Sequence, residues 1–403
     1  MSKRIKPVSL PVRLFDFPIT SFLLHTMRFI QFFLLAILFP VLVQAQQIIP
    51  PPALAAKSWL LYDYTSNQIL VNEKGDERIE PASITKLMTA YLTFAALKQG
   101  HLTQDQFITP SAEALRTPGE ESRMFLVVNK PVTVAELLHG LIIQSGNDAA
   151  RVLAETLAGN EEKFAGLMNS EAQRLGMKNT HFVNASGLPQ PQHYSTAYDL
   201  NLLAAAIVRD FPEYYPIYGL REYQYNNIKQ ANRNRLLWLD PYVDGLKTGH
   251  TESAGFCLVA SAKRDKRRLI SVVLGAASDN LRTSESQKLL NYGFQYFQAV
   301  RLYQGNQPVS SIRVWKGTEN KINVGFRDDL LLTVPTGQMG QIKVAMETHQ
   351  PLIAPVTIGQ KIGLLKLTLN GKPYAEFPLV ALESVSLANF FSRGWDTIRL
   401  LFQ

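Results

Sequence analysis

The sequence feature that most constrains the fold is the placement of predicted strands at both ends of a long helical region. Two strands are expected near its start, at residues 58–64 and 68–71. Three more are expected after it, at residues 242–250, 255–262 and 268–275. Helical periodicity occupies much of the chain between them, at residues 134–143, 149–157, 161–175 and 199–209. We therefore expect an α/β domain in which the strands of both ends meet in a mixed sheet covered by helices.

The sequence changes character after about residue 300, where a last predicted helix at residues 284–300 ends. Apolar and polar residues then alternate in short runs, and Asn370-Gly371 is a strong hairpin turn. We therefore expect a first domain over residues 54–300 and a small all-β domain over residues 301–384.

The first 45 residues have the pattern of a secretory signal peptide. Residues 32–43 form an unbroken apolar run after Arg28, too short to span a bilayer as a helix of about 20 residues. Because Met27 stands where such a peptide normally begins, residues 1–26 are interpreted as a possible non-native extension. The alternative is an uncleaved anchor, and in either case we expect the body of the protein to be exported.

The C-terminal residues 385–403 are predicted to form an amphipathic helix that binds a membrane surface. Large apolar residues recur at helical spacing, among them Phe390, Phe391 and Trp395, whereas arginines occupy other faces. So much aromatic surface in a polar terminal segment is costly in water. The alternative is that this helix packs on the all-β domain.

Composition excludes several classes of protein. With 46% apolar and 18% charged residues among 403, the chain can bury a core and is not a disordered protein. Part of the formal charge of +8 lies at the extreme N-terminus, so no nucleic-acid partner is expected. The single cysteine, Cys257, lies in an apolar run and is expected to be buried. The seven histidines lack the spacing of a metal site.

The candidate reaction centre is Ser83 together with Lys86, at the start of an apolar, helix-forming run. Residues three apart on a helix lie on one face, so the amine of Lys86 can reach the hydroxyl of Ser83. A serine is a poor nucleophile unless a neighbouring base takes its proton. A lysine can be that base when burial or nearby cations lower its pKa towards the working pH.

Two further motifs accompany this pair. Ser145-Gly146-Asn147 is expected in a turn between two helices, where a hydroxyl and an amide can point into a cleft. Lys247-Thr248-Gly249 is expected on a strand, where the glycine lets a substrate backbone approach closely. Residues 278–280 and 361–363 also match these short patterns, but only the first set has the expected order and context.

The three motifs resemble those of the active-site serine penicillin-recognising enzymes, and more closely those of the bacterial low-molecular-mass D-alanyl-D-alanine carboxypeptidases. The resemblance covers nearly the whole mature chain. It implies a β-lactamase/transpeptidase-like domain, no metal or organic cofactor, and an enzyme held by its tail at the periplasmic face of the inner membrane. The implied substrate is the peptidoglycan stem pentapeptide, from which the terminal D-alanine is removed, and β-lactams are the implied covalent inhibitors.

The resemblance also implies a role for each motif residue. Ser83 would attack the carbonyl between the two D-alanines, and Lys86 would act as general base. Ser145 would relay a proton to the leaving amine, and Asn147 would hold the substrate peptide.

The remaining site residues would bind the end of the substrate. Lys247 and Thr248 would bind the terminal carboxylate, with Arg282 as a helper. The backbone N–H groups of Ser83 and His250 would form the oxyanion hole, and water would then hydrolyse the acyl-enzyme.

Two alternatives remain open. The same catalytic parts could serve a DD-endopeptidase or a weak β-lactamase, although the loop at residues 181–194 offers no carboxylate for rapid hydrolysis of β-lactams. His181 and His193 are expected on the surface of that loop. The other alternative is a non-hydrolytic cell-wall binding protein that keeps the pocket to dock stem peptides, and the intact pair of Ser83 and Lys86 argues against it.

Overall fold

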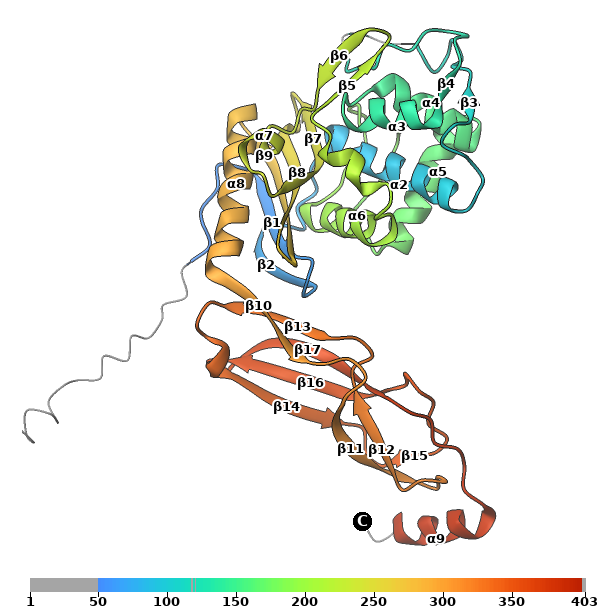
Figure 1. Ribbon diagram of the computed structural model, residues 1–403, viewed down its shortest axis with the longest axis vertical. Helices are drawn as coiled ribbons and strands as arrows, with labels where there is room; N and C mark the ends of the chain where they lie inside the picture. The colour runs from blue at the N-terminus through green and yellow to red at the C-terminus, as the bar shows by residue number, and fades with distance from the viewer. Residues whose placement is uncertain (1–49, 117–118, 120, 401–403) are drawn as a thin grey trace, which may run out of the picture. The chain divides into compact units, whose positions relative to one another are not determined.

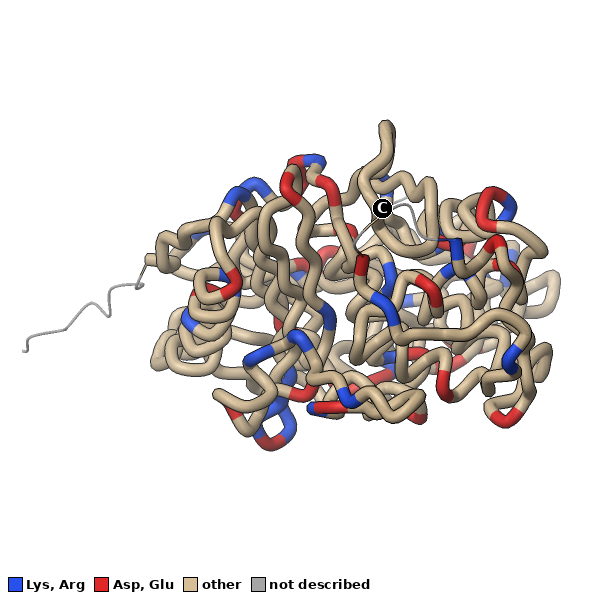
Figure 2. The backbone as a smooth tube through the Cα atoms, turned by 90° about the horizontal axis from the view of Figure 1, so that it is seen from above, with Lys and Arg blue, Asp and Glu red and all other residues tan. Residues whose placement is uncertain are grey.

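The computed structural model describes residues 50–116, 119 and 121–400, so the predicted signal peptide lies outside the described residues. Within the described ranges, no helix is both long and apolar enough to cross a membrane. Lysines and arginines are interspersed with aspartates and glutamates along the backbone (Figure 2). This mixture agrees with the modest formal charge of the chain.

A five-stranded sheet forms the centre of the first domain (Figure 1). Each pair of neighbouring strands in it is antiparallel. Its strand order is β2 (Gln68–Glu73), β1 (Ser58–Asp63), β9 (Arg267–Ala276), β8 (Gly255–Arg264) and β7 (Val243–Thr251). The pairing of β1 with β9 confirms that strands from the two ends of the helical region meet in one sheet.

Helices cover both faces of this sheet. Successive side chains of a strand point to opposite faces, so Leu60 of β1 joins one apolar core and its neighbour Leu61 joins the other. The second core includes Leu289 and Leu290 of α8 (Asp279–Tyr296). The helices on the other face are α2 (Lys86–Lys98), α3 (Val134–Ile142), α4 (Asn147–Ala158), α5 (Glu161–Arg174) and α6 (Ala197–Asp210).

Local sequence sets the ends of these helices. Thr133 and Glu136 form a capping box at the start of α3, and Gly159 in the left-handed conformation ends α4. Some shorter elements were not predicted. They are β3 (Phe107–Ile108), β4 (Val132–Thr133), η2 (Tyr215–Gly219), β5 (Glu222–Tyr225), β6 (Ile228–Ala231) and α7 (Leu236–Leu239).

The helix predicted at residues 284–300 is wrong at both ends. α8 begins five residues earlier, after Ser278, whose hydroxyl accepts a hydrogen bond from the backbone N–H of Leu281 at 3.2 Å. After α8 the chain forms β10 (Phe297–Tyr303), which pairs with β13 (Leu330–Pro335). Aromatic residues suit a strand well, and the pairing with a distant strand decides the outcome. The expected division at residue 300 falls within β10.

An all-β domain follows, as predicted. Besides the pair of β10 and β13, it contains a six-stranded sheet. The strand order is β14 (Ile342–Thr348), β16 (Lys361–Leu369), β17 (Lys372–Ala381), β12 (Lys321–Gly325), β11 (Pro308–Trp315) and β15 (Leu352–Ile353). The predicted turn at Asn370 and Gly371 joins β16 to β17, and both residues have positive φ.

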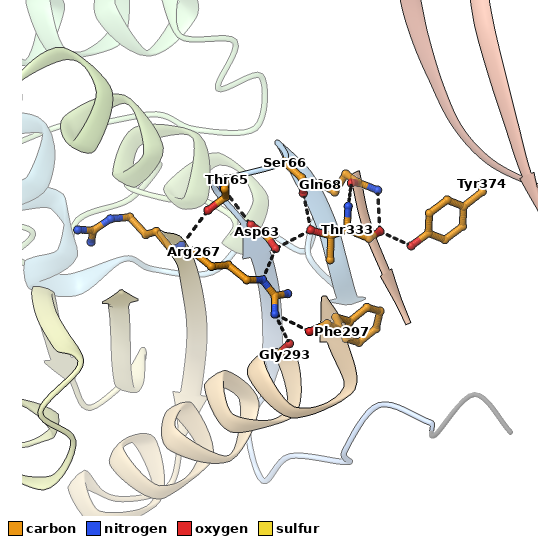
Figure 3. A network of polar contacts seen from close by, with 10 residues as sticks. Asp63, Thr65, Ser66, Gln68, Arg267, Gly293, Phe297, Thr333 and Tyr374 are labelled. Carbon is orange, nitrogen blue, oxygen red and sulfur yellow. Dashed lines mark hydrogen bonds and ion pairs between the residues drawn. The ribbon is translucent and has the colours of Figure 1, made fainter. Parts of the chain in front are cut away.

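A buried polar network joins the two domains (Figure 3). The carboxylate of Asp63, in β1, accepts hydrogen bonds from Arg267 Nε and from Thr333 Oγ1, both at 2.7 Å. Ser66 donates to the same Thr333 hydroxyl at 2.8 Å. Asp63 and Thr333 are fully buried, so these bonds are made away from water.

The helix α9 (Phe390–Leu400) ends the described chain. Its large apolar side chains are exposed, with Phe390 76%, Phe391 85% and Trp395 59% accessible. The carboxylate of Asp396 accepts a hydrogen bond from the backbone N–H of Lys316, at 2.7 Å. The helix therefore contacts the all-β domain through a polar residue and leaves apolar surface uncovered.

Candidate active site

The predicted nucleophile lies where a short 3₁₀ helix, η1 (Ala82–Thr85), meets α2. Ser83 belongs to η1 and Lys86 is the first residue of α2, so the expected α-helical start is a 3₁₀ turn. The two side chains still meet, since Lys86 Nζ lies 2.9 Å from Ser83 Oγ. The same amine donates to the backbone carbonyl of Ser186 at 2.6 Å, which fixes its position.

Burial makes the amine of Lys86 a weaker base than that of a free lysine. The residue is 1% exposed, and desolvation is the main cause that lowers its pKa to about 7. The carboxylate of Glu121 raises the pKa, and the cations of Arg233 and Arg151 lower it. A substantial fraction of Lys86 is therefore neutral at pH 7 and can accept the proton of Ser83.

The second and third motifs meet beside this pair. Ser145 has a φ of 58°, a strained conformation for a residue with a side chain and one that is common at functional sites. Lys247, on β7, donates a hydrogen bond to Ser145 Oγ at 2.9 Å. Burial, and then the charge of Lys86, lowers the pKa of Lys247 well below its ordinary value. A bound carboxylate would favour the charged form of this lysine.

Close backbone contacts explain two glycines of the site. A Cβ atom at Gly249 would lie 2.9 Å from the carbonyl oxygen of Pro81, so glycine lets β7 pack tightly against the segment that carries Ser83. A Cβ atom at Gly187 would lie only 1.9 Å from the carbonyl oxygen of Ala82, and its φ is +85°. Both glycines therefore bring neighbouring segments against the nucleophile.

One cavity of about 660 Å³ unites the predicted site residues. Lys86 and Lys247 are buried behind the wall of this cavity. Their amines are bonded to Ser83 and Ser145, which lie on the wall. Arg282 donates to the carbonyl of Gly249 at 3.0 Å. The predicted residues on the cavity wall are Ser83, Ser145, Asn147, Thr248, Gly249, His250 and Arg282.

The alternative motifs have other places in the fold. Ser278 caps α8, and Lys361 begins β16 of the all-β domain. Among the residues on the cavity wall that the sequence analysis missed are Glu121, Ser186 and Arg233. They lie in loops, where no periodic pattern marks a residue as facing a cavity.

The prediction that His193 lies on the loop surface is wrong. It is buried, 3% exposed, because its ring is placed between the backbone of Val183 and the side chain of Thr85. Val183 donates its N–H to Nδ1 at 3.1 Å, and Thr85 Oγ1 lies 2.8 Å from Nε2. His181, in contrast, is partly exposed.

A serine beside a buried lysine with a pKa of about 7 suits nucleophilic acyl transfer, and together with the family match it identifies this protein as a serine peptidase. Comparison with known families specifies the class further. Residues 45–278 match the D-alanyl-D-alanine carboxypeptidase family, and residues 297–386 match the C-terminal domain of penicillin-binding protein 5. The chain belongs to the D-alanyl-D-alanine carboxypeptidase family.

Individual relatives agree with this assignment. The chain is 41% identical to D-alanyl-D-alanine carboxypeptidase DacC of Escherichia coli (strain K12) over 369 residues, which cover 90% of this chain and 92% of the relative. It is 36% identical to DacF of Bacillus subtilis (strain 168), over 84% of this chain and 87% of that protein.

Solved structures show the same fold. Penicillin-binding protein 5 from Haemophilus influenzae matches with a TM-score of 0.80 and 41% identity, over 84% of this chain and 99% of that chain. Penicillin-binding protein D2 from Listeria monocytogenes, in the ampicillin-bound form, matches with a TM-score of 0.56 and 31% identity. That match covers 61% of this chain and all of the other. The expected fold class is confirmed.

Proposed function

We propose that this protein is a D-Ala-D-Ala carboxypeptidase that removes the terminal D-alanine from peptidoglycan pentapeptide stems through an acyl-enzyme on Ser83. The observation that carries the proposal is the 2.9 Å contact between Ser83 Oγ and the amine of Lys86, inside a cavity that also holds a second serine–lysine pair. The names of the relatives support the same substrate. β-Lactams would acylate the same serine.

The geometry supports a division of roles on the nucleophile side of the cavity. Neutral Lys86 takes the proton of Ser83 as its hydroxyl attacks the carbonyl between the two D-alanines. Ser145 relays a proton to the leaving amine, and its bond to Lys247 orients the hydroxyl for this task. Asn147 holds the peptide, and a water molecule completes hydrolysis of the acyl-enzyme.

The other side of the cavity suits a carboxylate, the group that ends the substrate. Thr248 on the cavity wall and Lys247, which is buried and bonded to Ser145, bind it, and Arg282 adds positive charge while it supports the backbone of β7 through Gly249. The backbone N–H groups of Ser83 and His250 form the oxyanion hole. No metal or organic cofactor takes part in this scheme.

The test is a comparison of the wild type with Ser83→Ala. We expect the wild type to release D-alanine from a synthetic pentapeptide and to be labelled covalently by a fluorescent penicillin, and the variant to do neither. Removal of the nucleophile from such a centre costs a factor on the order of 10⁶ in turnover. Labelling without D-alanine release would favour an endopeptidase or weak β-lactamase, which cross-linked dimers and nitrocefin would reveal. Peptide binding without labelling would favour the non-hydrolytic binding protein.

We further propose that residues 1–45 are a signal peptide and that the exported protein is held peripherally on the periplasmic face of the inner membrane by α9. The exposed aromatic side chains of α9 support this location, because Phe390, Phe391 and Trp395 bury apolar area when they enter the lipid interface. The family's substrate, peptidoglycan, also lies outside the cytoplasmic membrane.

A further inference from the structure

A carboxylate that the proposed mechanism does not use lies on the cavity wall. Glu121 belongs to a segment that is bonded to the turn of the second motif. The backbone N–H of Asn147 donates to the carbonyl of Ser122 at 2.8 Å. The carboxylate of Asp148 accepts the N–H groups of Met124 at 2.9 Å and of Leu126 at 3.1 Å. The position of Glu121 is thus set by the same turn that carries Ser145 and Asn147.

The Glu121 side chain is 4% exposed and is fully engaged. Arg151 donates to Oε1 at 2.7 Å and to Oε2 at 3.2 Å, which is a bidentate ion pair. The amide nitrogen of Asn147 donates to Oε2 at 2.6 Å. Arg151 follows Asn147 by one turn of α4, and its Nε donates to the carbonyl of Ala114 at 2.7 Å. The Arg151 guanidinium is therefore held by the Glu121 carboxylate and by the carbonyl of Ala114.

This contact determines which way the amide of Asn147 points. A carboxylate with no proton can only accept, so the atom that faces Glu121 must be the nitrogen. Burial alone would raise the pKa of Glu121, but the hydrogen bonds from Arg151 and Asn147 outweigh it and lower the pKa, so the group is ionised. The amide oxygen of Asn147 is buried, and among the described residues it has no hydrogen-bond partner. It is left as a free acceptor.

We propose that Glu121, held by Arg151, is a positioning residue that keeps the amide of Asn147 in one orientation. The amide oxygen is then the acceptor for an N–H donor of the reaction centre, either a substrate peptide or the ammonium of Lys86. The second hydrogen of the amide nitrogen remains for a substrate carbonyl. The inference builds on the proposed function, because Asn147 is there the residue that holds the peptide.

The test uses Glu121→Gln, which keeps the size of the side chain. A glutamine can donate to the amide oxygen of Asn147 as well as accept from its nitrogen, so the orientation is no longer unique. We expect kcat/KM for the pentapeptide to fall about tenfold, since a bond to a charged group is lost. Arg151→Met removes the guanidinium but leaves the Glu121 carboxylate, which can still accept the hydrogen bond from the Asn147 amide. Glu113→Gln is the matched control. It makes the same substitution at an exposed carboxylate and should leave kcat/KM unchanged.

The pH profile separates the loss of one charge from a general loss of structure. The charged groups that act on the pKa of Lys86 are Glu121, Arg233, Arg151 and Asp148, and the charge of Lys86 in turn lowers the pKa of Lys247 and of His193. Glu121 raises the pKa of Lys86 and Arg151 lowers it. The acid limb of kcat/KM should therefore move to lower pH in Glu121→Gln and to higher pH in Arg151→Met. Thermal unfolding of each variant confirms that the comparison is made on folded protein.

The pH dependence of the rate of acylation by a fluorescent penicillin is measured for the same enzymes. If the wild type is labelled but releases no D-alanine, the proposed function fails, and the positioning role is judged from acylation alone. Limbs that move in opposite directions show the effect of the two charges on Lys86. The positioning role itself is supported by a fall of about tenfold in kcat/KM of folded Glu121→Gln, compared with the wild type at the pH optimum of each enzyme. A Glu121→Gln enzyme as active as the wild type at its pH optimum overturns the proposal. If Arg151→Met does not fold, Glu121→Gln alone still decides, because wild-type kcat/KM at its pH optimum would refute the idea.

Discussion

At the scale of single residues, His193 connects the loop at residues 181–194 with the nucleophile. Since the backbone N–H of Val183 donates to Nδ1, the hydrogen of the neutral ring must be on Nε2, from which it is donated to Thr85 Oγ1. Thr85 is the residue before Lys86. Protonation of the ring would remove the acceptor at Nδ1, and burial lowers the pKa of His193 to about 4.

The low pKa of His193 predicts a loss of stability in acid. Between about pH 6.5 and 4 the unfolded chain binds a proton that the folded one does not, so the free energy of unfolding falls as pH falls through this range. His193→Gln keeps an acceptor and a donor but does not titrate, so it should lose about 2 kcal/mol less than the wild type between pH 7 and pH 4.5. Urea unfolding at both pH values measures this difference. His101→Gln, at an exposed histidine, is the control, and an equal loss in wild type and His193→Gln would contradict the prediction.

The site residues differ in how far sequence could predict them. Ser83 and Lys86 are three positions apart, so helical geometry alone brings them together. Lys247 was predicted from its motif and strand, and in the structure its amine donates a hydrogen bond to Ser145 Oγ. Glu121 could not be predicted, because its place depends on bonds between a polar loop and the turn before α4 rather than on any local period. His193 was misjudged for a similar reason, since loop residues are usually exposed.

At the scale of elements, patterns of period two and 3.6 predicted well wherever one face of an element is buried against the core. β8 and β9 were both predicted as strands, and α3 was predicted to within one residue of its end. The prediction extended α8 too far towards the C-terminus, and the error has a physical cause. The aromatic residues Phe294, Tyr296 and Phe297 are compatible with helix or strand, and β10 exists because β13, distant in sequence, pairs with it. A local pattern contains no information about that partner.

The element α9 gives a prediction about location. Deletion of residues 390–403 should release the exported protein from membranes into the soluble fraction, because the apolar side chains that enter the lipid interface are lost. Membrane flotation and penicillin labelling of each fraction measure the outcome. Thr397→Ala, on the same helix, is the control that should stay bound. A truncated protein that still floats with membranes would point to an anchor within residues 1–45.

At the scale of the whole molecule, Thr333 is where the two domains are joined most closely. Its hydroxyl donates to Asp63 and accepts from Ser66, and its backbone N–H donates to the side chain of Gln68 at 2.6 Å (Figure 3). Arg267 extends the connection, since it donates to Asp63 and to the carbonyl of Phe297 at 2.6 Å. The network thus includes β1, β9, the start of β10 and β13. Such a buried network of hydrogen bonds favours one relative arrangement of the domains.

Thr333→Val tests whether this network makes the two domains one cooperative unit. Valine has the shape of threonine, so no cavity forms, but Asp63 and Ser66 each lose a buried partner, at a cost of about 1–3 kcal/mol. Loss of penicillin labelling and loss of the total circular dichroism signal should coincide during urea unfolding of the wild type and separate in the variant. Thr333→Ser keeps the hydroxyl and should remain cooperative.

Because Thr333 is not on the wall of the active-site cavity, D-alanine release by folded Thr333→Val should stay within about twofold of wild type. Coincident transitions in Thr333→Val would show that strand β10, which continues directly from α8, is sufficient to couple the domains.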